Sequence, residues 1–236
     1  EESFHRHKLR RASDFGARSR ALTELADRLG LEQAPLRIEC YDISNLGPTD
    51  TVGSMVVFED GLPKRSDYRR FRIKGVPGQD DFASMEEMLR RRFTRLIEER
   101  SESPASGRRF SYPPALVVVD GGRGQLSSAS KVLGDLGLQI PHVGLAKRLE
   151  EVYFPDHPEP LMIPRGSEAL FVLQHLRDEA HRFAVTYHRR TREKRALRSP
   201  LGDVPGVGPA RNKAVLKRFG SLARLRRAEV EQIAET

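Results

Sequence analysis

Three segments in the first third of the chain show the alternating apolar and polar residues of β-strands. They are residues 36 to 44 (LRIECYDIS), 52 to 61 (VGSMVVFEDG) and 67 to 75 (DYRRFRIKG). The sequence Glu59-Asp60-Gly61 at the end of the second segment predicts a hairpin turn toward the third. We therefore expect three antiparallel strands in this part of the chain.

The segments before and after these strands have apolar residues at helical spacing instead. Residues 17 to 29 form the first, and Gly30 follows it as a helix-ending residue. Residues 81 to 100 form the second, which Asp81 is suited to cap. The apolar residues that define the two helices are Leu22, Leu25 and Leu29 in the first and Phe82, Met85, Leu89, Phe93 and Leu96 in the second.

Strands and helices alternate in the following part of the chain. In order, we expect a strand at 115 to 119, a helix over about 125 to 136, a strand at 142 to 147, short strands around Tyr153 and Leu161, and a long helix from Ser167 to about Arg195. Three strands followed by alternating helices and strands imply a mixed sheet with helices on its faces. The predicted fold class is therefore α/β, followed by a small helical tail.

The positive charge is concentrated in that tail. The formal net charge is +8, but residues 1 to 181 hold 27 Lys and Arg against 28 Asp and Glu, whereas residues 182 to 236 hold 14 against 5. A basic segment after a neutral body suits binding to nucleic-acid phosphates, and a solvated basic helix is the plainer alternative.

Cysteine usage and apolar run lengths exclude two classes of protein. A single cysteine, Cys40, rules out an internal disulfide framework and is interpreted as a small core residue. No apolar run approaches the roughly 18 residues that span a bilayer, so we expect no membrane partner and a cytoplasmic location. The chain begins with Glu1 rather than Met, as removal of an N-terminal portion would leave it.

Two aspartates follow apolar strand residues. Asp42 lies at the end of the first predicted strand, and Asp120 ends the later strand. Ligand sites in open α/β sheets gather at strand ends. Two carboxylates brought together there need a cation, for which a hard divalent ion such as Mg²⁺ or Mn²⁺ is suited. Each acid taken alone is also compatible with a turn or cap.

Three glycines follow Asp120 in the segment VVVDGGRGQL, residues 117 to 126. The order strand, glycines, helix is similar to a phosphate-binding loop, but it matches neither common nucleotide-binding motif. We expect the glycines to leave space for a phosphate of bound DNA, with Arg123 and Gln125 contributing to its binding.

Candidate polar groups also lie on two helices. In the segment RDEAHRFAVTYHRR, residues 177 to 190, His181 borders the buried face of the helix. Such a histidine is either a packed structural residue or a metal ligand or proton carrier facing the strand ends. Asp80 and Asp81 precede another helix, and capping explains one of them.

The tail contains the turn VPGVGP, residues 204 to 209, followed by a basic amphipathic helix. The glycines Gly206 and Gly208 permit close approach, and amides at a helix start can bind a phosphate. This is the helix-hairpin-helix pattern, which predicts sequence-independent contact with a DNA backbone; a simple helical hairpin is the alternative. The basic residues placed to face the backbone are Arg211, Lys213, Lys217 and Arg218.

Five ordered motifs resemble the C-terminal half of the bacterial excinuclease UvrC family. They are YDIS (41 to 44), YRRFRI (68 to 73), GQDDFASM (78 to 85), VDGGRGQL (119 to 126) and RDEAHRFAVTYHR (177 to 189). The resemblance implies a lead-in helix and linker over 1 to 34, an RNase H-like endonuclease domain over 35 to 197, and a helix-hairpin-helix DNA-binding domain over 198 to 236.

In that family this half makes the 5′ incision on the damaged strand during nucleotide excision repair, by metal-dependent phosphodiester hydrolysis. Carried over, Asp42, Asp120 and His181 form a catalytic triad that binds Mg²⁺ or Mn²⁺, with Asp81 as an auxiliary acid. His181 acting as general base is an alternative. Lys147 either contacts the scissile phosphate or faces solvent. The competing hypothesis is a non-catalytic DNA-binding adaptor in which the acids are structural.

The resemblance also implies partners. The substrate is double-stranded DNA that carries a lesion, a bubble or a single-strand junction, and the protein partner is UvrB within the UvrABC system. We expect this chain to lack three parts of the family's architecture: the GIY-YIG domain that makes the 3′ incision, the segment that docks on UvrB, and the second hairpin of the tail.

Overall fold

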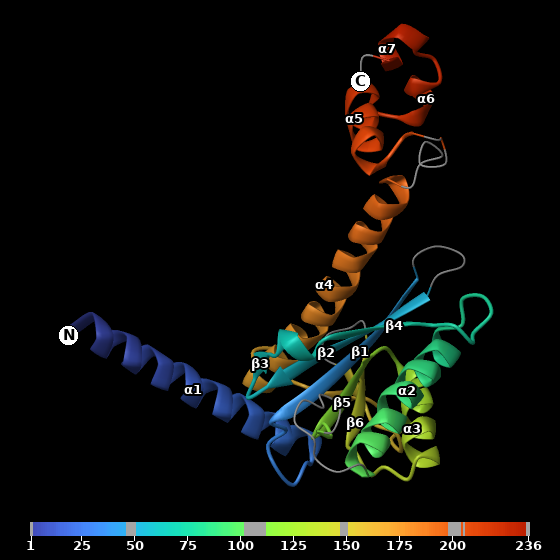
Figure 1. Cartoon of the computed structure of the whole chain (residues 1–236). Helices are drawn as coiled ribbons and strands as arrows, with labels where there is room; N and C mark the ends of the chain where they lie inside the picture. The colour runs from blue at the N-terminus through green and yellow to red at the C-terminus, as the bar shows by residue number, and fades with distance from the viewer. Residues whose placement is uncertain are drawn as a thin grey trace. The chain divides into compact units, whose positions relative to one another are not determined.

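The computed structural model describes residues 2–45, 51–101, 112–146, 151–197, 204 and 206–234. The chain divides into two compact units, Glu1–Ala184 and Val185–Thr236. Its elements in chain order are α1 (Glu2–Leu29), β1 (Arg37–Asn45), β2 (Thr51–Glu59), β3 (Leu62–Pro63), η1 (Arg65–Asp67), β4 (Arg69–Arg72), α2 (Asp81–Ser101), β5 (Leu116–Asp120), α3 (Arg123–Asp135), β6 (His142–Leu145), β7 (Glu151–Tyr153), β8 (Leu161–Met162), α4 (Glu168–Leu197), α5 (Pro209–Phe219), α6 (Leu222–Leu225) and α7 (Val230–Ala234) (Figure 1). No helix in the described part is long and apolar enough to cross a membrane.

The first unit is built on one mixed sheet. Its strands follow the order β3-β2-β1-β5-β6-β7-β8, and β4 also pairs with β2. β1 is antiparallel to β2 and parallel to β5, which is parallel to β6, and the remaining two strands continue antiparallel. The prediction of a mixed α/β sheet flanked by helices is confirmed.

The predicted hairpin forms, but its second arm is interrupted. Asp60 and Gly61 have φ values of 52° and 77°, as a two-residue hairpin turn that follows the strand twist requires. The second arm starts with β3 and the 3-10 turn η1, and of the strand expected over 67 to 75 only Arg69–Arg72, β4, forms. Both β3 and β4 pair with β2. A three-residue 3-10 turn is too short to leave a periodic signal in the sequence.

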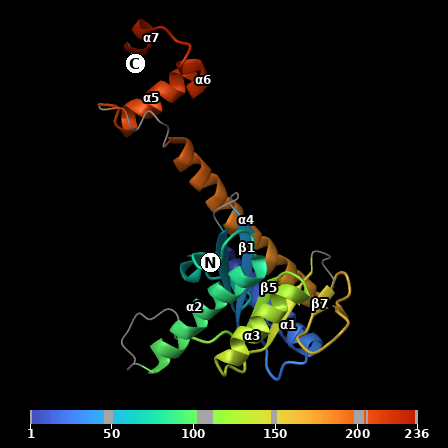
Figure 2. The same cartoon turned by 90° about the vertical axis from the view of Figure 1, so that its right-hand side faces the viewer.

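Side chains of β1 and β2 alternate between two helical layers. Tyr41 and Met55 are cross-strand partners, and the Tyr41 ring lies 6.4 Å from that of Phe93 in α2. Phe58 points to the other face, where its ring lies edge-on to His175 of α4 at 4.9 Å. α2 and its neighbour α3 therefore cover one face of the sheet, and α4 covers the other (Figure 2).

The core follows the predicted apolar pattern. Cys40 is buried, as expected for a small core residue, and the apolar residues of β5 are all inaccessible to solvent. α1 begins at Glu2, well before the expected start at residue 17, because its early turns lack the apolar stripe on which that expectation rests. Its last turns belong to the core, since Leu22, Leu25 and Leu29 are buried there.

The second unit, taken by itself, includes three short helices. α5 starts after Gly208 with Pro209 in its first turn, and it ends at Gly220, whose φ of 72° is the left-handed conformation that suits glycine. Gly206 also has a positive φ, and its carbonyl accepts a hydrogen bond from Arg211 at 2.9 Å. The buried residues Val215 and Leu225 form the small interior of this unit.

Candidate active site

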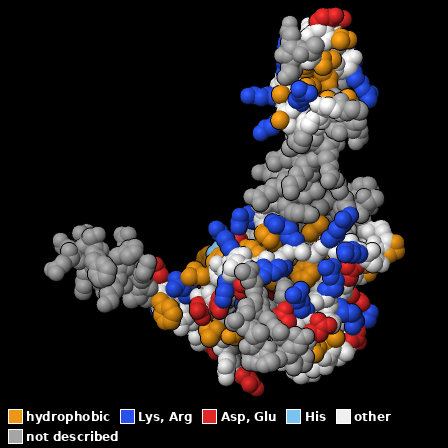
Figure 3. Space-filling view, viewed as in Figure 1, with side chains coloured by type: hydrophobic (Ala, Val, Ile, Leu, Met, Phe, Trp, Pro, Cys, Tyr) orange, Lys and Arg blue, Asp and Glu red, His pale blue; other side chains and the backbone are white. Residues whose placement is uncertain are grey.

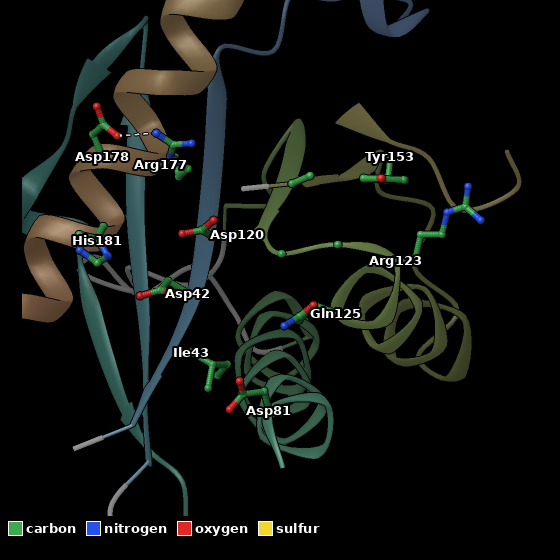
Figure 4. Close-up of a pocket in the computed structure, with 13 residues that line it drawn as sticks. Asp42, Ile43, Asp81, Asp120, Arg123, Gln125, Tyr153, Arg177, Asp178 and His181 are labelled. Atoms are coloured by element: carbon green, nitrogen blue, oxygen red, sulfur yellow. Dashed lines mark hydrogen bonds and ion pairs between the residues drawn. The ribbon is translucent and has the colours of Figure 1, made fainter. Parts of the chain in front are cut away.

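A pocket of about 780 Å³ opens where the parallel strands β5 and β6 end (Figure 4). Ligand pockets typically measure ~300–1,000 Å³, so this one has room for a nucleotide. The residues that line it are Asp42, Ile43, Asp81, Asp120, Gly121, Gly122, Arg123, Gln125, Ala146, Tyr153, Arg177, Asp178 and His181.

Asp42 and Asp120 lie on adjacent parallel strands at this pocket. Tyr41 of β1 is in register with Val119 of β5, so the next residues, Asp42 and Asp120, project from the same face of the sheet. The expectation that Asp42 ends its strand is wrong, because β1 continues to Asn45 by pairing with β2. Strand pairing rather than a turn therefore fixes the backbone of Asp42.

The surroundings of Asp42 disfavour its ionised form. Burial raises the pKa of Asp42 to about 6, and the carboxylates of Asp120 and Asp81 add to this increase. A hydrogen bond of 2.8 Å from the Ser44 hydroxyl and the nearby His181 act in the opposite direction. The site thus concentrates negative charge at a buried position, an arrangement that an additional cation would stabilise.

Asp80, rather than Asp81, caps α2. The Asp80 carboxylate accepts hydrogen bonds from the amides of Phe82 and Ala83, both at 3.0 Å. Asp81 is instead the first helical residue, and its carboxylate accepts a hydrogen bond from Asn45 at 3.0 Å while it lines the pocket. The capping prediction for Asp81 is wrong because the helix starts one residue earlier than a cap at 81 requires.

Two side chains of α4 reach the pocket from one flank of the helix. Arg177 and His181 are four residues apart and so lie on the same side, and Figure 4 shows both beside the two strand acids. The guanidinium of Arg177 donates a hydrogen bond of 3.0 Å to Asp178. Arg177 has no role in the sequence-based prediction, although its spacing from His181 is a readable signal.

The glycines after β5 serve packing more than ligand approach. Gly121 makes room for Gln125, whose Cδ would lie 2.6 Å from a Cβ atom at position 121. Gly124 makes room for the ring of Phe82, which is 51% exposed and not in the core. Gly122 has open space around it and is the N-cap of α3 without a side-chain capping bond. Of the three glycines, Gly122 therefore keeps the open space that we expected for a phosphate, together with the backbone amides that follow it.

The opposite wall of the pocket carries an aromatic and a basic residue. The guanidinium carbon of Arg123 lies 5.4 Å from the ring centre of Tyr153, and Figure 4 shows both across the pocket from His181. Tyr153 belongs to β7, and the sequence-based prediction gives it no role. A lone tyrosine in a three-residue strand has no pattern around it that marks a site.

The donor groups suit a hard divalent cation by type, although no complete coordination sphere is preformed among the described residues. Asp42 and Asp120 supply the oxygen ligands that Mg²⁺ and Mn²⁺ prefer. Ser54, the cross-strand partner of Asp42, has a buried hydroxyl with no hydrogen-bond partner among the described residues. Throughout the part of the chain that the structure describes, no group of three or more His, Cys, Asp or Glu side chains is placed to hold an ion. Neither His181 nor Asp81 is therefore placed with the two strand acids as a third protein ligand.

The remaining predicted residues lie elsewhere. Lys147 falls outside the described residues. The predicted DNA-binding residues of the tail lie in the second unit, and they are Gly206, Gly208, Arg211, Lys213, Lys217 and Arg218. All six are exposed there.

An open mixed sheet that presents carboxylates from two adjacent parallel strands to a histidine on a covering helix defines an RNase H-like α/β domain. Residues 26–185 match the family model described as the UvrC RNase H endonuclease domain, so the chain belongs to this family.

Curated relatives carry the name UvrABC system protein C. The chain is 55% identical to that of Mycolicibacterium paratuberculosis (strain ATCC BAA-968 / K-10), over 98% of this chain and 37% of the relative. It is 52% identical to that of Thermobifida fusca (strain YX), over 100% of this chain and 38% of the relative. The chain therefore spans somewhat more than a third of the length of these relatives. A crystal structure of human ENDOV aligns over 75% of this chain and 98% of that chain with a TM-score of 0.39 and 13% identity, a likeness too weak to bear on the site.

Proposed function

We propose that this chain hydrolyses DNA phosphodiester bonds and makes the 5′ incision on the damaged strand in nucleotide excision repair. The observation that carries the proposal is the pair Asp42 and Asp120, which directly follow the paired residues Tyr41 and Val119 on neighbouring strands, at a large pocket that His181 also lines. Membership of an endonuclease family supports the chemistry, and the name of the relatives supports the repair system.

In this proposal Asp42 and Asp120 hold Mg²⁺ or Mn²⁺. When bound, such an ion acts as a Lewis acid that activates a water nucleophile and offsets charge on the phosphate. His181, on the flank of α4, completes the ligand set or accepts a proton as general base. Asp81 holds the neighbouring Asn45 and adds negative charge at the edge of the site.

The phosphate has two groups to bind it. The first is Arg177, which forms an ion pair with Asp178, a side chain that is 68% exposed. Solvent screens an ion pair whose acid is this exposed, so Arg177 can exchange Asp178 for a phosphate at small cost. The second group is the start of α3 after Gly122, where the first amides lack a side-chain cap and favour an anion.

Basic surfaces of the two units support DNA as the substrate. Figure 3 shows Lys and Arg side chains gathered on one face of the first unit. Arg70, Arg72, Lys74 and Arg91 are among the exposed basic residues of this unit. We assign the nuclease to residues 35–197 and a helix-hairpin-helix DNA-binding domain to 198–236. The glycine turn and the exposed basic helix α5 support this second assignment. UvrB is the proposed protein partner.

The test uses a DNA duplex that carries a lesion and a nick, or a bubble, incubated with the chain and Mn²⁺ or Mg²⁺. The chain is expected to cut the damaged strand on the 5′ side of the lesion and leave 3′-hydroxyl and 5′-phosphate ends, and Asp42→Asn and Asp120→Asn should not cut. Asp135→Asn, an exposed acid on α3, is the matched control and should cut normally. DNA binding with no cutting by the unaltered chain would favour the non-catalytic adaptor instead.

A further inference from the structure

Two segments that the motifs single out meet in space, on the side of α4 away from the pocket. The Tyr68 hydroxyl, at the start of the YRRFRI segment, donates a hydrogen bond of 3.0 Å to Glu179 of α4, and both residues are buried. The Arg182 guanidinium donates to both oxygens of the same carboxylate, at 2.6 and 2.5 Å. Glu179 therefore joins the edge of the sheet to α4 through charge-assisted hydrogen bonds.

A second contact between the same elements lies one helical turn further along. The Tyr68 ring lies edge-on to Phe183 with centroids 5.1 Å apart. The guanidinium carbon of Arg70, from β4, lies 3.7 Å from the centre of the Phe183 ring, and the guanidinium donates a hydrogen bond of 3.3 Å to the Phe183 carbonyl. α4 is thus held at two successive turns by side chains from β4 and the residue before it.

The positions of these contacts on α4 give them a specific mechanical effect. With about 100° per residue, Glu179 and Phe183 lie about 40° apart on one flank of the helix. Arg177 and His181 lie about 40° apart on the other flank. Between the flanks runs the buried apolar stripe that faces the sheet, formed by Leu173, Leu176, Ala180 and Ala184. A contact that holds one flank therefore fixes the rotation of α4 about its axis, and with it the flank that lines the pocket.

We infer that Tyr68 and Glu179 are positioning residues that set the rotation of α4 and thereby place His181 in the pocket. This inference rests on the proposed function for its kinetic consequences. Side-chain ends lie about 5–6 Å from a helix axis, so a rotation of about 10° moves His181 by on the order of 1 Å. A displacement of that size can lower a reaction rate by up to about a hundredfold. The apolar stripe alone constrains rotation less, because apolar contacts have no fixed direction.

The kinetic test uses Tyr68→Phe, which keeps the ring contact with Phe183 and removes only the hydroxyl. We expect kcat for DNA cleavage to fall about tenfold with KM changed less than twofold. Glu179→Gln should act in the same direction. In a His181→Ala background, Tyr68→Phe should lower the residual kcat less than twofold, because the positioned group is gone. Independent, multiplicative effects of Tyr68→Phe and His181→Ala would overturn the inference.

A spectroscopic test separates this inference from the proposed function, because it needs no DNA and no cutting. The imidazole signals of His181 in ¹H–¹⁵N NMR spectra should shift in Tyr68→Phe, while those of His142 stay unchanged. Ser130→Ala is the matched control: the Ser130 hydroxyl lies 2.8 Å from the His142 ring nitrogen, so its removal should shift His142 and leave His181 unchanged. His181 signals that do not respond to Tyr68→Phe in a folded protein would overturn the inference even if the chain cuts DNA.

Discussion

Two buried carboxylates, three residues apart on opposite faces of β1, have contrasting surroundings. Glu39 faces α2, where Arg92 donates to both of its oxygens at 2.8 and 3.1 Å and the Tyr41 hydroxyl donates at 2.5 Å. Asp42 projects to the other face, where its hydrogen bond comes from the neutral Ser44 hydroxyl and the carboxylate of Asp120 lies nearby. Positively charged side chains of the protein therefore neutralise Glu39, whereas Asp42 lies beside another negative charge.

We interpret the difference as that between a structural acid, Glu39, and a proposed metal ligand, Asp42. Both side chains of the pair Glu39 and Arg92 are fully buried, and Arg37 adds a second ion pair to Glu39 at 3.3 Å. Bringing Asp42 and Asp120 together lowers the free energy of unfolding. Such an arrangement of like charges is typical of sites where a bound cation or substrate offsets the repulsion. The contrast predicts that mutations on the α2 face change stability and that mutations on the pocket face change catalysis.

The largest expected effect comes from removing an acid on the pocket face. Asp42→Asn should lower kcat for DNA cleavage by about a thousandfold or more, because one of two proposed metal ligands is lost. Its free energy of unfolding at pH 7 should be unchanged or higher, since the wild-type carboxyl has a pKa raised to about 6 and is ionised there at a cost. Single-turnover cleavage and urea denaturation measure the two quantities. Cutting at the wild-type rate would remove Asp42 from the site.

The second effect belongs to the α2 face. Arg92→Met should lower the free energy of unfolding by about 3 kcal/mol, because Glu39 loses its fully buried cation and keeps the 3.3 Å ion pair with Arg37. The double variant Glu39→Gln with Arg92→Met should recover part of this loss. Urea denaturation measures both, and a loss below about 1 kcal/mol for Arg92→Met alone would show that the core neutralises Glu39 in another way.

A third prediction concerns Arg177, the positively charged side chain that α4 contributes to the pocket. Arg177→Gln should lower kcat by about a hundredfold, the size seen when one donor to a developing negative charge is removed, with little change in thermal stability. Asp178→Asn removes the exposed partner of Arg177 and should leave kcat within about threefold of wild type. Equal losses in the two variants would place Arg177 in a structural ion pair rather than on the phosphate.

The smallest expected effect concerns Tyr41 and Asp42, which are adjacent in β1 but lie on its two opposite faces. Tyr41→Phe removes the hydroxyl that donates to Glu39, and the free energy of unfolding should fall by about 1–2 kcal/mol. Cleavage per folded molecule should change less than twofold, although Tyr41 precedes Asp42 in the strand. A large loss of kcat without a loss of stability would show that the two faces of β1 are coupled.

The sequence was sufficient for the order of the elements and for the meeting of the strand acids. The change from strand to helical periodicity locates α2, β5, α3 and α4, and the strand-helix-strand order predicts a mixed sheet with helices on its faces. It did not distinguish Asp80 from Asp81, because either acid satisfies the statistics of a helix cap and only the start of the hydrogen-bond ladder decides.

Other features depend on tertiary contacts that no local pattern contains. The glycines Gly121 and Gly124 face side chains from α3 and α2, so their role in packing appears only once the helices are placed. Arg92 lies among the apolar residues of α2, and its partner Glu39 is 53 positions away in the sequence. The contacts between Tyr68 and Glu179 join positions even farther apart, 111 residues in sequence.

The central claim is that a divalent cation neutralises the pair Asp42 and Asp120. Anomalous diffraction from a crystal of the chain soaked in Mn²⁺ tests it most directly. We predict an anomalous peak in the pocket, in contact with both carboxylates, that disappears in Asp42→Asn crystals soaked in the same way. A pocket without a peak, or an equal peak in the Asp42→Asn crystal, would contradict the claim.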